Sequence, residues 1–205
     1  MKSDFLKFRL LLHCILNKIR MVKSKYIFLI IILTIIIVTA PPSQINKVEQ
    51  EECPIKTELR TVWGSSLSPF INSGDKIKIL FKYYNCYEIK REDIVLYNFA
   101  GNENPLIKIV KGVPGDKFEL RKSDSGWNIL INNQILKNSK SEPYVISRNR
   151  YKMLSLYESD YKGVIPKNAY LLLGNLVSGS VDSTRFGLVD KSNIIGKVEF
   201  LNNEV

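Results

Sequence analysis

Short hydrophobic runs, several of them alternating with polar residues, follow one another through the chain after residue 58 and are separated by Gly, Asp, Asn and Pro. Alternation with a period of two is typical of β-strands that bury one face. The predicted strands are Lys76–Phe81, Asp93–Asn98, Lys117–Leu120, Trp127–Ile131, Gln134–Leu136, Ala169–Leu173 and Ile194–Phe200. This part of the chain shows no long 3.6-residue period. We therefore predict an all-β fold, a small antiparallel barrel or folded sheet.

Two connections between these runs differ in character. Asn132-Asn133 separates two predicted strands and predicts a hairpin turn, because asparagine tolerates the positive φ that such turns need. Residues 137–162 are rich in Ser, Lys, Tyr and Arg, and we predict that they form a long loop.

The longest hydrophobic stretch, Tyr26–Ala40, carries no charge. With Met21–Ser24 as an interfacial flank it offers roughly 15–18 membrane-compatible residues, near the lower limit for a spanning helix. Basic residues precede it and uncharged polar residues follow it, which predicts a cytoplasmic N-terminus. A cleaved signal peptide ending at Ala40 is the alternative, which Pro41 disfavours. Translation from Met21 is an alternative start.

These patterns divide the chain into four parts. We predict a basic cytoplasmic segment over 1–25, a transmembrane anchor over 26–40, a linker over 41–58 and a folded domain over 59–205. The protein would then be a single-pass protein of the inner or plasma membrane, in contact with lipid, with its folded domain on the outer side.

The positive charge of the chain is concentrated near its N-terminus. The formal net charge is +10, and the first 25 residues hold seven Lys or Arg against one acidic residue. The remaining 180 residues carry an excess of only +4. That bias is too weak for a phosphate-binding face, so we predict no nucleic-acid partner.

Cysteine and histidine are scarce. Cys53 and Cys86 would both lie outside the cell, where a disulfide is possible, whereas Cys14 and the only histidine, His13, would lie inside. No CxxC pair occurs, so thiol–metal chemistry is not expected. A Ser/His/Asp triad is excluded because His13 lies on the opposite side of the membrane from the folded domain.

A buried lysine can replace histidine as the base that activates a serine. The lysine must be neutral, and apolar surroundings lower its pKa. Lys108 is flanked by apolar residues, and on a strand it would share a face with Leu106 and Val110. Ser66 lies in a tight turn that begins at Gly64. Taken alone, Lys108 fits better as an ordinary exposed lysine and Ser66 as an ordinary turn serine.

Four segments in order change this balance. They are Ser66-Leu67-Ser68-Pro69 with Gly74-Asp75, Arg91-Glu92-Asp93-Ile94-Val95, Lys108 through Asp116, and Gly174 through Gly187. In order and spacing they resemble the signature boxes of the type I signal peptidase family. The most specific match is the segment from Lys108, which is similar to Lys-Arg-x-x-Gly-x-Pro-Gly-Asp.

The resemblance implies a membrane-bound serine endopeptidase that cleaves signal peptides from exported preproteins as a monomer, without metal or cofactor. It implies Ser66 as nucleophile and Lys108 as general base. Ser180 would hydrogen-bond the lysine amine, Asp182 would support it, and the backbone N–H of Ser66 would bind the oxyanion. Gly64 stands where some members add a second serine hydroxyl.

The chain also departs from the family pattern. Ile109 and Thr184 replace arginines, Glu92 replaces a glycine, and Asn175 replaces an aspartate. Two alternatives therefore stay open. One is a specialised pilin or conjugative-transfer peptidase of the same superfamily, and the other is an inactive membrane-tethered β-domain that acts as a binding module.

Overall fold

The computed structural model describes residues 53–100, 104–177 and 180–201, and most of them lie in or between β-strands. The strands are β1 Lys56–Thr61, β2 Lys76–Phe81, β3 Ile94–Tyr97, β4 Leu106–Gly112, β5 Phe118–Ser123, β6 Gly126–Ile131, β7 Gln134–Ile135, β8 Val145–Ile146, β9 Ala169–Leu173, β10 Val189–Asp190 and β11 Ile194–Phe200. The helices are α2 Arg148–Asp160 and α3 Ser183–Phe186, with 3-10 turns η1 Tyr83–Asn85 and η2 Lys191–Asn193.

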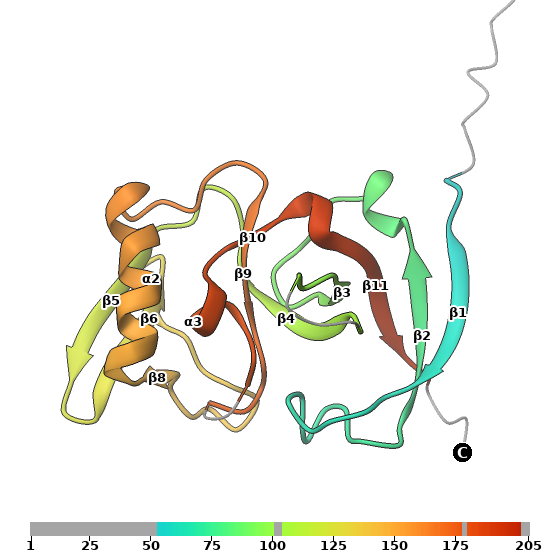
Figure 1. The fold of residues 1–205 in the computed structure, drawn as a ribbon, viewed down its shortest axis with the longest axis horizontal. Helices are drawn as coiled ribbons and strands as arrows, with labels where there is room; N and C mark the ends of the chain where they lie inside the picture. The colour runs from blue at the N-terminus through green and yellow to red at the C-terminus, as the bar shows by residue number, and fades with distance from the viewer. Residues whose placement is uncertain (1–52, 101–103, 178–179, 202–205) are drawn as a thin grey trace, which may run out of the picture. The chain divides into compact units, whose positions relative to one another are not determined.

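A seven-stranded sheet forms the larger part of the domain (Figure 1). Its order is β1-β2-β11-β3-β4-β9-β10, and every neighbouring pair is antiparallel. Strands β2, β9 and β11 have the predicted limits. Strand β1 was not predicted, and it begins at Lys56, inside the segment predicted to be linker. Its side chains are mostly exposed because it is an edge strand, so it lacks a hydrophobic run that would mark it.

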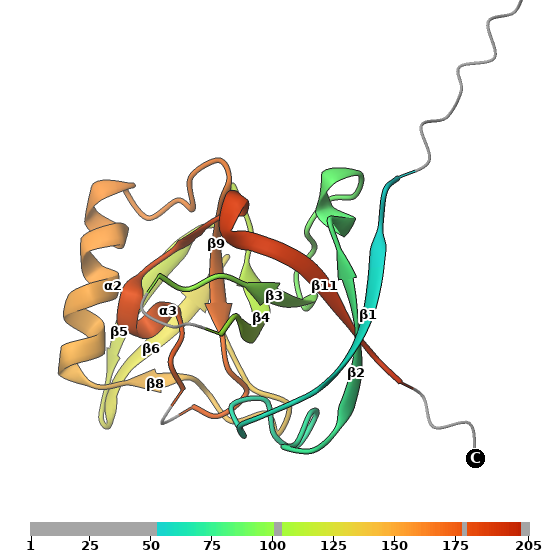
Figure 2. The ribbon, with the colours of Figure 1, turned by 45° about the vertical axis from the view of Figure 1, so that its right-hand side comes forward.

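A second, smaller sheet packs with helix α2 (Figure 2). Its order is β5-β6-β7, with β8 pairing to β6, and α2 contacts β5 and β6. The turn between β6 and β7 has positive φ at Asn132 and Asn133, as predicted. The predicted long loop over 137–162 is wrong, since it contains β8 and all of α2. Only Leu154 of α2 is fully buried, so the helix shows little of the 3.6-residue pattern.

The fold class is confirmed in its coarser form, because the described residues are mostly β, in antiparallel sheets, with few helices. The predicted anchor Tyr26–Ala40 and the basic segment 1–25 lie outside the described residues. Within the described ranges, no helix has the length and apolar character that crossing a membrane requires.

Three hydrophobic clusters fill the domain. One joins β3, β4 and β9 around Tyr97, Val110 and Leu172, and another joins the small sheet to Leu154 of α2. The third lies between β2, β3 and β4 and includes Leu67, which directly follows Ser66 in the chain. The turn that carries Ser66 is therefore anchored in the core.

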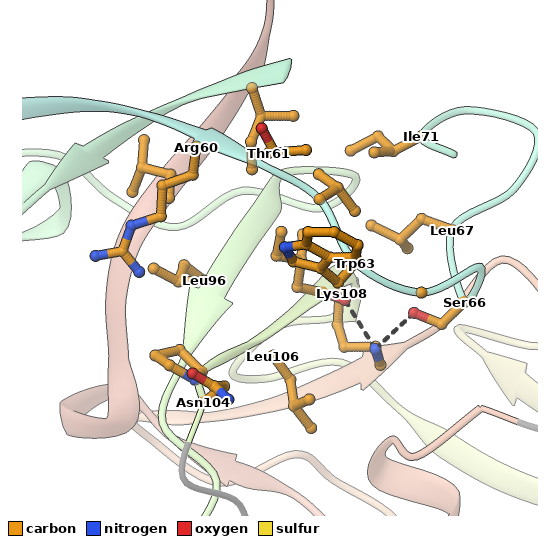
Figure 3. A pocket seen from close by; sticks show the side chains of 16 residues that line it. Arg60, Thr61, Trp63, Ser66, Leu67, Ile71, Leu96, Asn104, Leu106 and Lys108 are labelled. Carbon is orange, nitrogen blue, oxygen red and sulfur yellow. Dashed lines mark hydrogen bonds between the residues drawn. The ribbon is translucent and has the colours of Figure 1, made fainter. Parts of the chain in front are cut away.

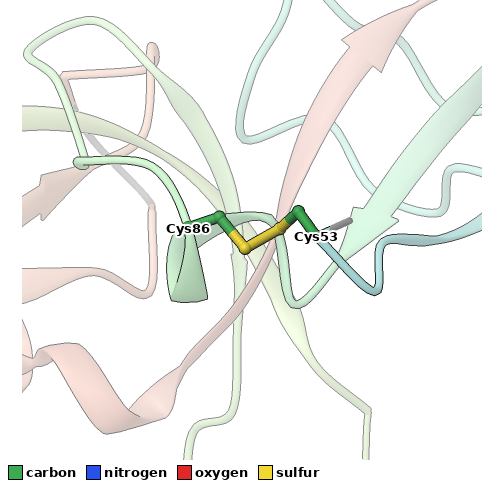
Figure 4. The surroundings of a disulfide bond; sticks show 2 residues. All are labelled: Cys53 and Cys86. Carbon is green, nitrogen blue, oxygen red and sulfur yellow. A yellow bond between two sulfur atoms is a disulfide. The ribbon is translucent and has the colours of Figure 1, made fainter. Parts of the chain in front are cut away.

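Cys53 and Cys86 form a disulfide (Figure 4), with their Cα atoms 6.0 Å apart. The bridge joins the residues just before β1 to the end of η1. Cys14 lies outside the described residues.

Glu92 stands where the family pattern has a glycine. Its backbone conformation and its ion pair explain why either residue can occupy this position. Its φ is +68°, in the left-handed region that favours glycine. Its carboxylate lies 2.8 Å from the Nζ of Lys111, a side chain that is only 7% exposed. The ion pair thus supplies an anion to a buried ammonium at the cost of a strained backbone.

We expect Glu92→Ala to lower the free energy of unfolding by about 1–2 kcal/mol, because it leaves the Lys111 ammonium buried without its anion and retains the strained φ. Glu92→Gly loses the same ion pair but relieves the backbone, so it should cost about 1 kcal/mol less than Glu92→Ala. Urea denaturation of the three proteins measures the order. Equal stabilities of the alanine and glycine variants would contradict the role given to the backbone.

Candidate active site

Ser66 and Lys108, 42 positions apart in the chain, meet at one end of a cleft (Figure 3). The Nζ of Lys108 lies 2.8 Å from the Oγ of Ser66 and donates a second hydrogen bond of 2.8 Å to the carbonyl oxygen of Ile107. Ser66 comes from the turn after β1, and Lys108 comes from the middle of β4. The structure therefore brings together the two residues that the sequence singled out.

Lys108 is 3% exposed. Its strand alternates as predicted: Leu106 and Val110 pack in one hydrophobic cluster, while Ile107 and Ile109 pack in another. Burial lowers the pKa of Lys108 from 10.5 to about 8, and the negative charge of Asp182 opposes part of this fall. An amine with such a pKa is neutral in an appreciable fraction of molecules near neutral pH.

The turn that carries Ser66 is fixed from two directions. Leu67 and Ile71 are buried in the core on one side. On the other side the carbonyl oxygen of Ser66 accepts hydrogen bonds from the backbone N–H groups of Asn175, at 2.7 Å, and Leu176, at 3.3 Å. Within the part of the chain that the structure describes, the backbone N–H of Ser66 donates no hydrogen bond.

Ser180 and Asp182 lie beside this turn and are both buried. Gly174, at the end of β9, leaves room for Ser180 and for the turn: a Cβ there would collide with the Oγ of Ser180 and would lie 2.8 Å from the carbonyl oxygen of Ser66. The predicted hydrogen bond from Ser180 to the lysine amine is not formed, since the Ser180 hydroxyl has no partner among the described residues.

Asp182 organises the backbone instead of contacting the lysine. Its Oδ2 accepts a 3.0 Å hydrogen bond from the N–H of Gly174, and its Oδ1 accepts from the N–H and the hydroxyl of Thr184 at 3.1 and 2.6 Å. Asp182 therefore caps α3 and ties it to the end of β9.

Arg91 and Asp116, which had no specific role in the sequence analysis, form an ion pair in the structure. The Nη2 of Arg91 donates a 2.7 Å hydrogen bond to Oδ1 of Asp116, which also accepts from Asn132. Burial alone would raise the pKa of Asp116, but the hydrogen bonds from Arg91, Val113 and Asn132 outweigh it and lower that pKa. This pair fixes the far end of the strand that carries Lys108. The only sequence signal for this ion pair is that Arg91 begins one of the matching motifs and Asp116 ends another.

Arg150, on α2, was also missed. Its Nη1 donates a 2.8 Å hydrogen bond to the hydroxyl of Thr184, and its Nη2 donates a 3.3 Å hydrogen bond to the carbonyl oxygen of Ser180. Thr184 is the position where the family pattern has an arginine. A guanidinium from the helix thus reaches Thr184, whereas the segment's own arginine, Arg185, lies one position later in the chain.

We expect Arg150→Ala to lower the free energy of unfolding by about 1–2 kcal/mol, because two charge-assisted hydrogen bonds are lost. Arg150→Lys should recover less than half of this, since an ammonium cannot reproduce the planar fork. Arg148→Ala, an exposed change on the same helix, is the control. Denaturation curves for the three variants measure the effect, and equal stabilities of Arg150→Ala and Arg148→Ala would contradict it.

The cleft beside Ser66 and Lys108 has a volume of about 760 Å³. Its rim includes Trp63, which is 87% exposed, and Asn104. Its apolar wall is formed by Leu67, Ile71, Ile77, Ile79, Leu96 and Ile107. Such a surface suits apolar side chains of a ligand. Among the described residues no group of His, Cys, Asp or Glu side chains is arranged to hold a metal ion.

An antiparallel β-domain that places a serine hydroxyl against a buried lysine amine in an apolar cleft has the parts that a Ser/Lys hydrolase requires. Residues 53–202 match the model of the family described as "Signal peptidase, peptidase S26". The chain belongs to this family, and it is a serine peptidase.

The similar proteins are named as signal peptidases. The chain is 29% identical over 151 residues to signal peptidase IB of Staphylococcus aureus strain COL, covering 68% of this chain and 74% of the relative. It is 29% identical over 142 residues to signal peptidase I of Bacillus caldolyticus, covering 68% and 75%. A crystal structure of a signal peptidase I from Enterococcus faecalis V583 is similar at 23% identity with a TM-score of 0.40, covering 54% of this chain and 97% of that one.

Proposed function

We propose that this protein removes signal peptides from exported preproteins, with Ser66 as nucleophile and Lys108 as general base. The observation that carries the proposal is the 2.8 Å contact between Ser66 Oγ and a lysine amine that is buried and has a pKa of about 8. At this distance the Ser66 hydroxyl can also donate its proton to Lys108 when the amine is neutral. Family membership supports the substrate class, and the names of the relatives favour it over a pilin peptidase or an inactive binding module.

The reaction follows from these positions. Neutral Lys108 takes the proton of Ser66 as the serine oxygen attacks the scissile carbonyl. The oxyanion of the tetrahedral intermediate is bound by the backbone N–H of Ser66, which has no competing acceptor within the described residues. The resulting ammonium of Lys108 gives its proton to the leaving amine. Water, deprotonated by the lysine, then hydrolyses the acyl-enzyme and restores Ser66.

We assign supporting roles to Ser180 and Asp182. Asp182 holds Gly174 and Thr184 in place, and its charge raises the pKa of Lys108 against the effect of burial. The unpartnered hydroxyl of Ser180 is buried beside the turn that carries Ser66. Rotation of this hydroxyl toward the amine would orient the lysine when substrate is bound.

The substrate is an extended segment with small side chains at the −1 and −3 positions. It would lie along the cleft between the stretch after β1 and residues 104–107, which line it on two sides. The apolar wall of the cleft would contact these small side chains.

The topology we propose is an N-terminal anchor at Tyr26–Ala40 with the peptidase domain on the outer side of the membrane. The uncharged hydrophobic stretch after a basic segment supports the orientation. The disulfide between Cys53 and Cys86 fits an oxidising compartment. The domain would act there as a monomer, in contact with membrane lipid, on exported preproteins.

The test is cleavage of a preprotein that carries alanine at −1 and −3, followed by sequencing of the new N-terminus. We expect one cut, after the −1 residue, and no cut when that alanine is replaced by tryptophan. The same preparation carrying Ser66→Ala excludes a contaminating protease. Failure of the wild type to cut any of several preproteins would refute the function, and cleavage by the Ser66→Ala protein would refute the nucleophile.

A further inference from the structure

Asn175 is a buried side chain next to the turn that carries Ser66, and it stands where the family pattern has an aspartate. It is 1% exposed. It directly follows Gly174 at the end of β9, and its own backbone N–H already binds the carbonyl oxygen of Ser66 at 2.7 Å. The exchange of an acid for an amide here has a structural reason.

The orientation of the Asn175 amide is fixed by partners of known polarity. Its Nδ2 lies 2.6 Å from the backbone carbonyl oxygen of Ser68, which can only accept. Its Oδ1 lies 3.0 Å from the backbone N–H of Ser139, which can only donate. Nδ2 also donates a 2.9 Å hydrogen bond to the hydroxyl of Ser139. A side chain that donates at one end and accepts at the other is therefore required.

We propose that Asn175 is a positioning residue that clamps the nucleophile turn through its neutral amide, so that restoring the family's aspartate would impair this enzyme. The inference rests on the proposed function of Ser66. Residue 175 holds Ser66 by its backbone N–H and Ser68 by its side chain, and it joins both to the segment at Ser139.

A carboxylate at position 175 would satisfy only half of these contacts. It would still accept from the N–H of Ser139. It would also place an oxygen without a proton opposite the carbonyl oxygen of Ser68, in a site with almost no exposure to water. The turn would have to move away or the carboxyl would have to become protonated. A protonated carboxyl can donate to Ser68, so acid should restore the clamp.

Other ionisable groups lie near the clamp and must be controlled for. On the elements packed against Asn175 they are Lys108 of β4, Asp182 before α3, and Lys137, Lys140, Glu142 and Tyr144 of the segment that includes Ser139. All are present in both wild type and variant. The ratio of variant to wild-type activity at each pH therefore removes what both proteins share, and the pH–rate midpoint of each protein shows whether the new carboxylate has moved the pKa of Lys108.

The experiment compares wild type, Asn175→Asp and the control Asn133→Asp, which makes the same exchange in an exposed hairpin turn. At pH 8 we expect kcat of Asn175→Asp to fall about 10- to 100-fold with KM within about twofold, since a displaced nucleophile slows chemistry more than binding. The deficit relative to wild type should shrink as the pH is lowered to 6. Asn133→Asp should match wild type throughout.

Hydrogen exchange gives a readout that does not depend on activity. The N–H groups of Ser68, Phe70 and Ile71 are hydrogen-bonded within the nucleophile turn. In Asn175→Asp at pH 8 they should exchange faster, while those of the small sheet should not change. Unchanged exchange in the turn, or wild-type kcat, would overturn the clamp. Absence of cleavage by the wild type, with faster exchange in the variant, would overturn the proposed function and leave the clamp standing.

Discussion

Replacement of Lys108 by methionine is expected to abolish cleavage of a preprotein, with kcat/KM lowered by about 10⁴-fold or more. Methionine has nearly the shape of the lysine side chain but no basic nitrogen. Because the site is almost fully buried, the thioether should pack there without loss of thermal stability. The measurement is single-turnover cleavage together with a melting curve. A methionine variant with appreciable activity would contradict the role of the lysine as base.

Ser66→Ala should lose as much activity as Lys108→Met, and the double variant should lose no more than either, because the two groups act as a unit. The pH dependence of the wild type gives a second check. The base works only when neutral, so activity should rise about tenfold for each pH unit below about 8 and level off above it. A rate that stays constant from pH 6 to pH 8 would show that Lys108 is not the base.

Gly174→Ala is expected to have the next largest effect, lowering activity by about 100-fold or more and the free energy of unfolding by about 1–3 kcal/mol. The added Cβ would collide with the hydroxyl of Ser180 and lie 2.8 Å from the carbonyl oxygen of Ser66. The backbone at residue 174 cannot easily move to avoid this clash. Its N–H donates a hydrogen bond to Asp182, and its carbonyl oxygen accepts one of 2.7 Å from the hydroxyl of Tyr144. The clash would therefore be relieved by displacing the nucleophile turn.

Gly115→Ala is the matched control. Nothing lies within 4 Å of a Cβ at that position, but its φ is +86°, so the change strains the backbone without a steric clash. We expect a loss of about 1 kcal/mol in stability with kcat near that of wild type. Steady-state kinetics and denaturation of both variants separate the two causes. A Gly174→Ala protein with wild-type kcat would show that the turn tolerates the added group.

Short hydrophobic runs predicted the strands that bury many side chains. Ala169–Leu173 and Ile194–Phe200 were predicted with their observed limits, and the Asn132-Asn133 turn was recognised by its chemistry. Elements that bury few side chains were not predicted. The edge strand β1 is mostly exposed, and α2 fully buries a single leucine. Neither leaves the periodic hydrophobic signal on which such prediction depends.

The sequence by itself determined Ser66 and Lys108 as the pair to examine, because each lies in a motif whose spacing is local and because no histidine in the predicted outer domain could compete. The structure alone decided that their atoms meet at 2.8 Å and that the lysine is buried enough to lower its pKa to about 8. Burial and contact depend on which distant segments pack together, which no local pattern specifies.

The same reason explains the supporting residues. In the sequence, Arg150 is an ordinary cation of a predicted loop and Asn175 is a departure from a motif. They acquire roles only through partners 34 and 107 positions away. Local spacing fixed the reacting groups of this protein. Tertiary packing decided what holds them in place, because hydrogen bonds between distant segments form only after the chain has folded.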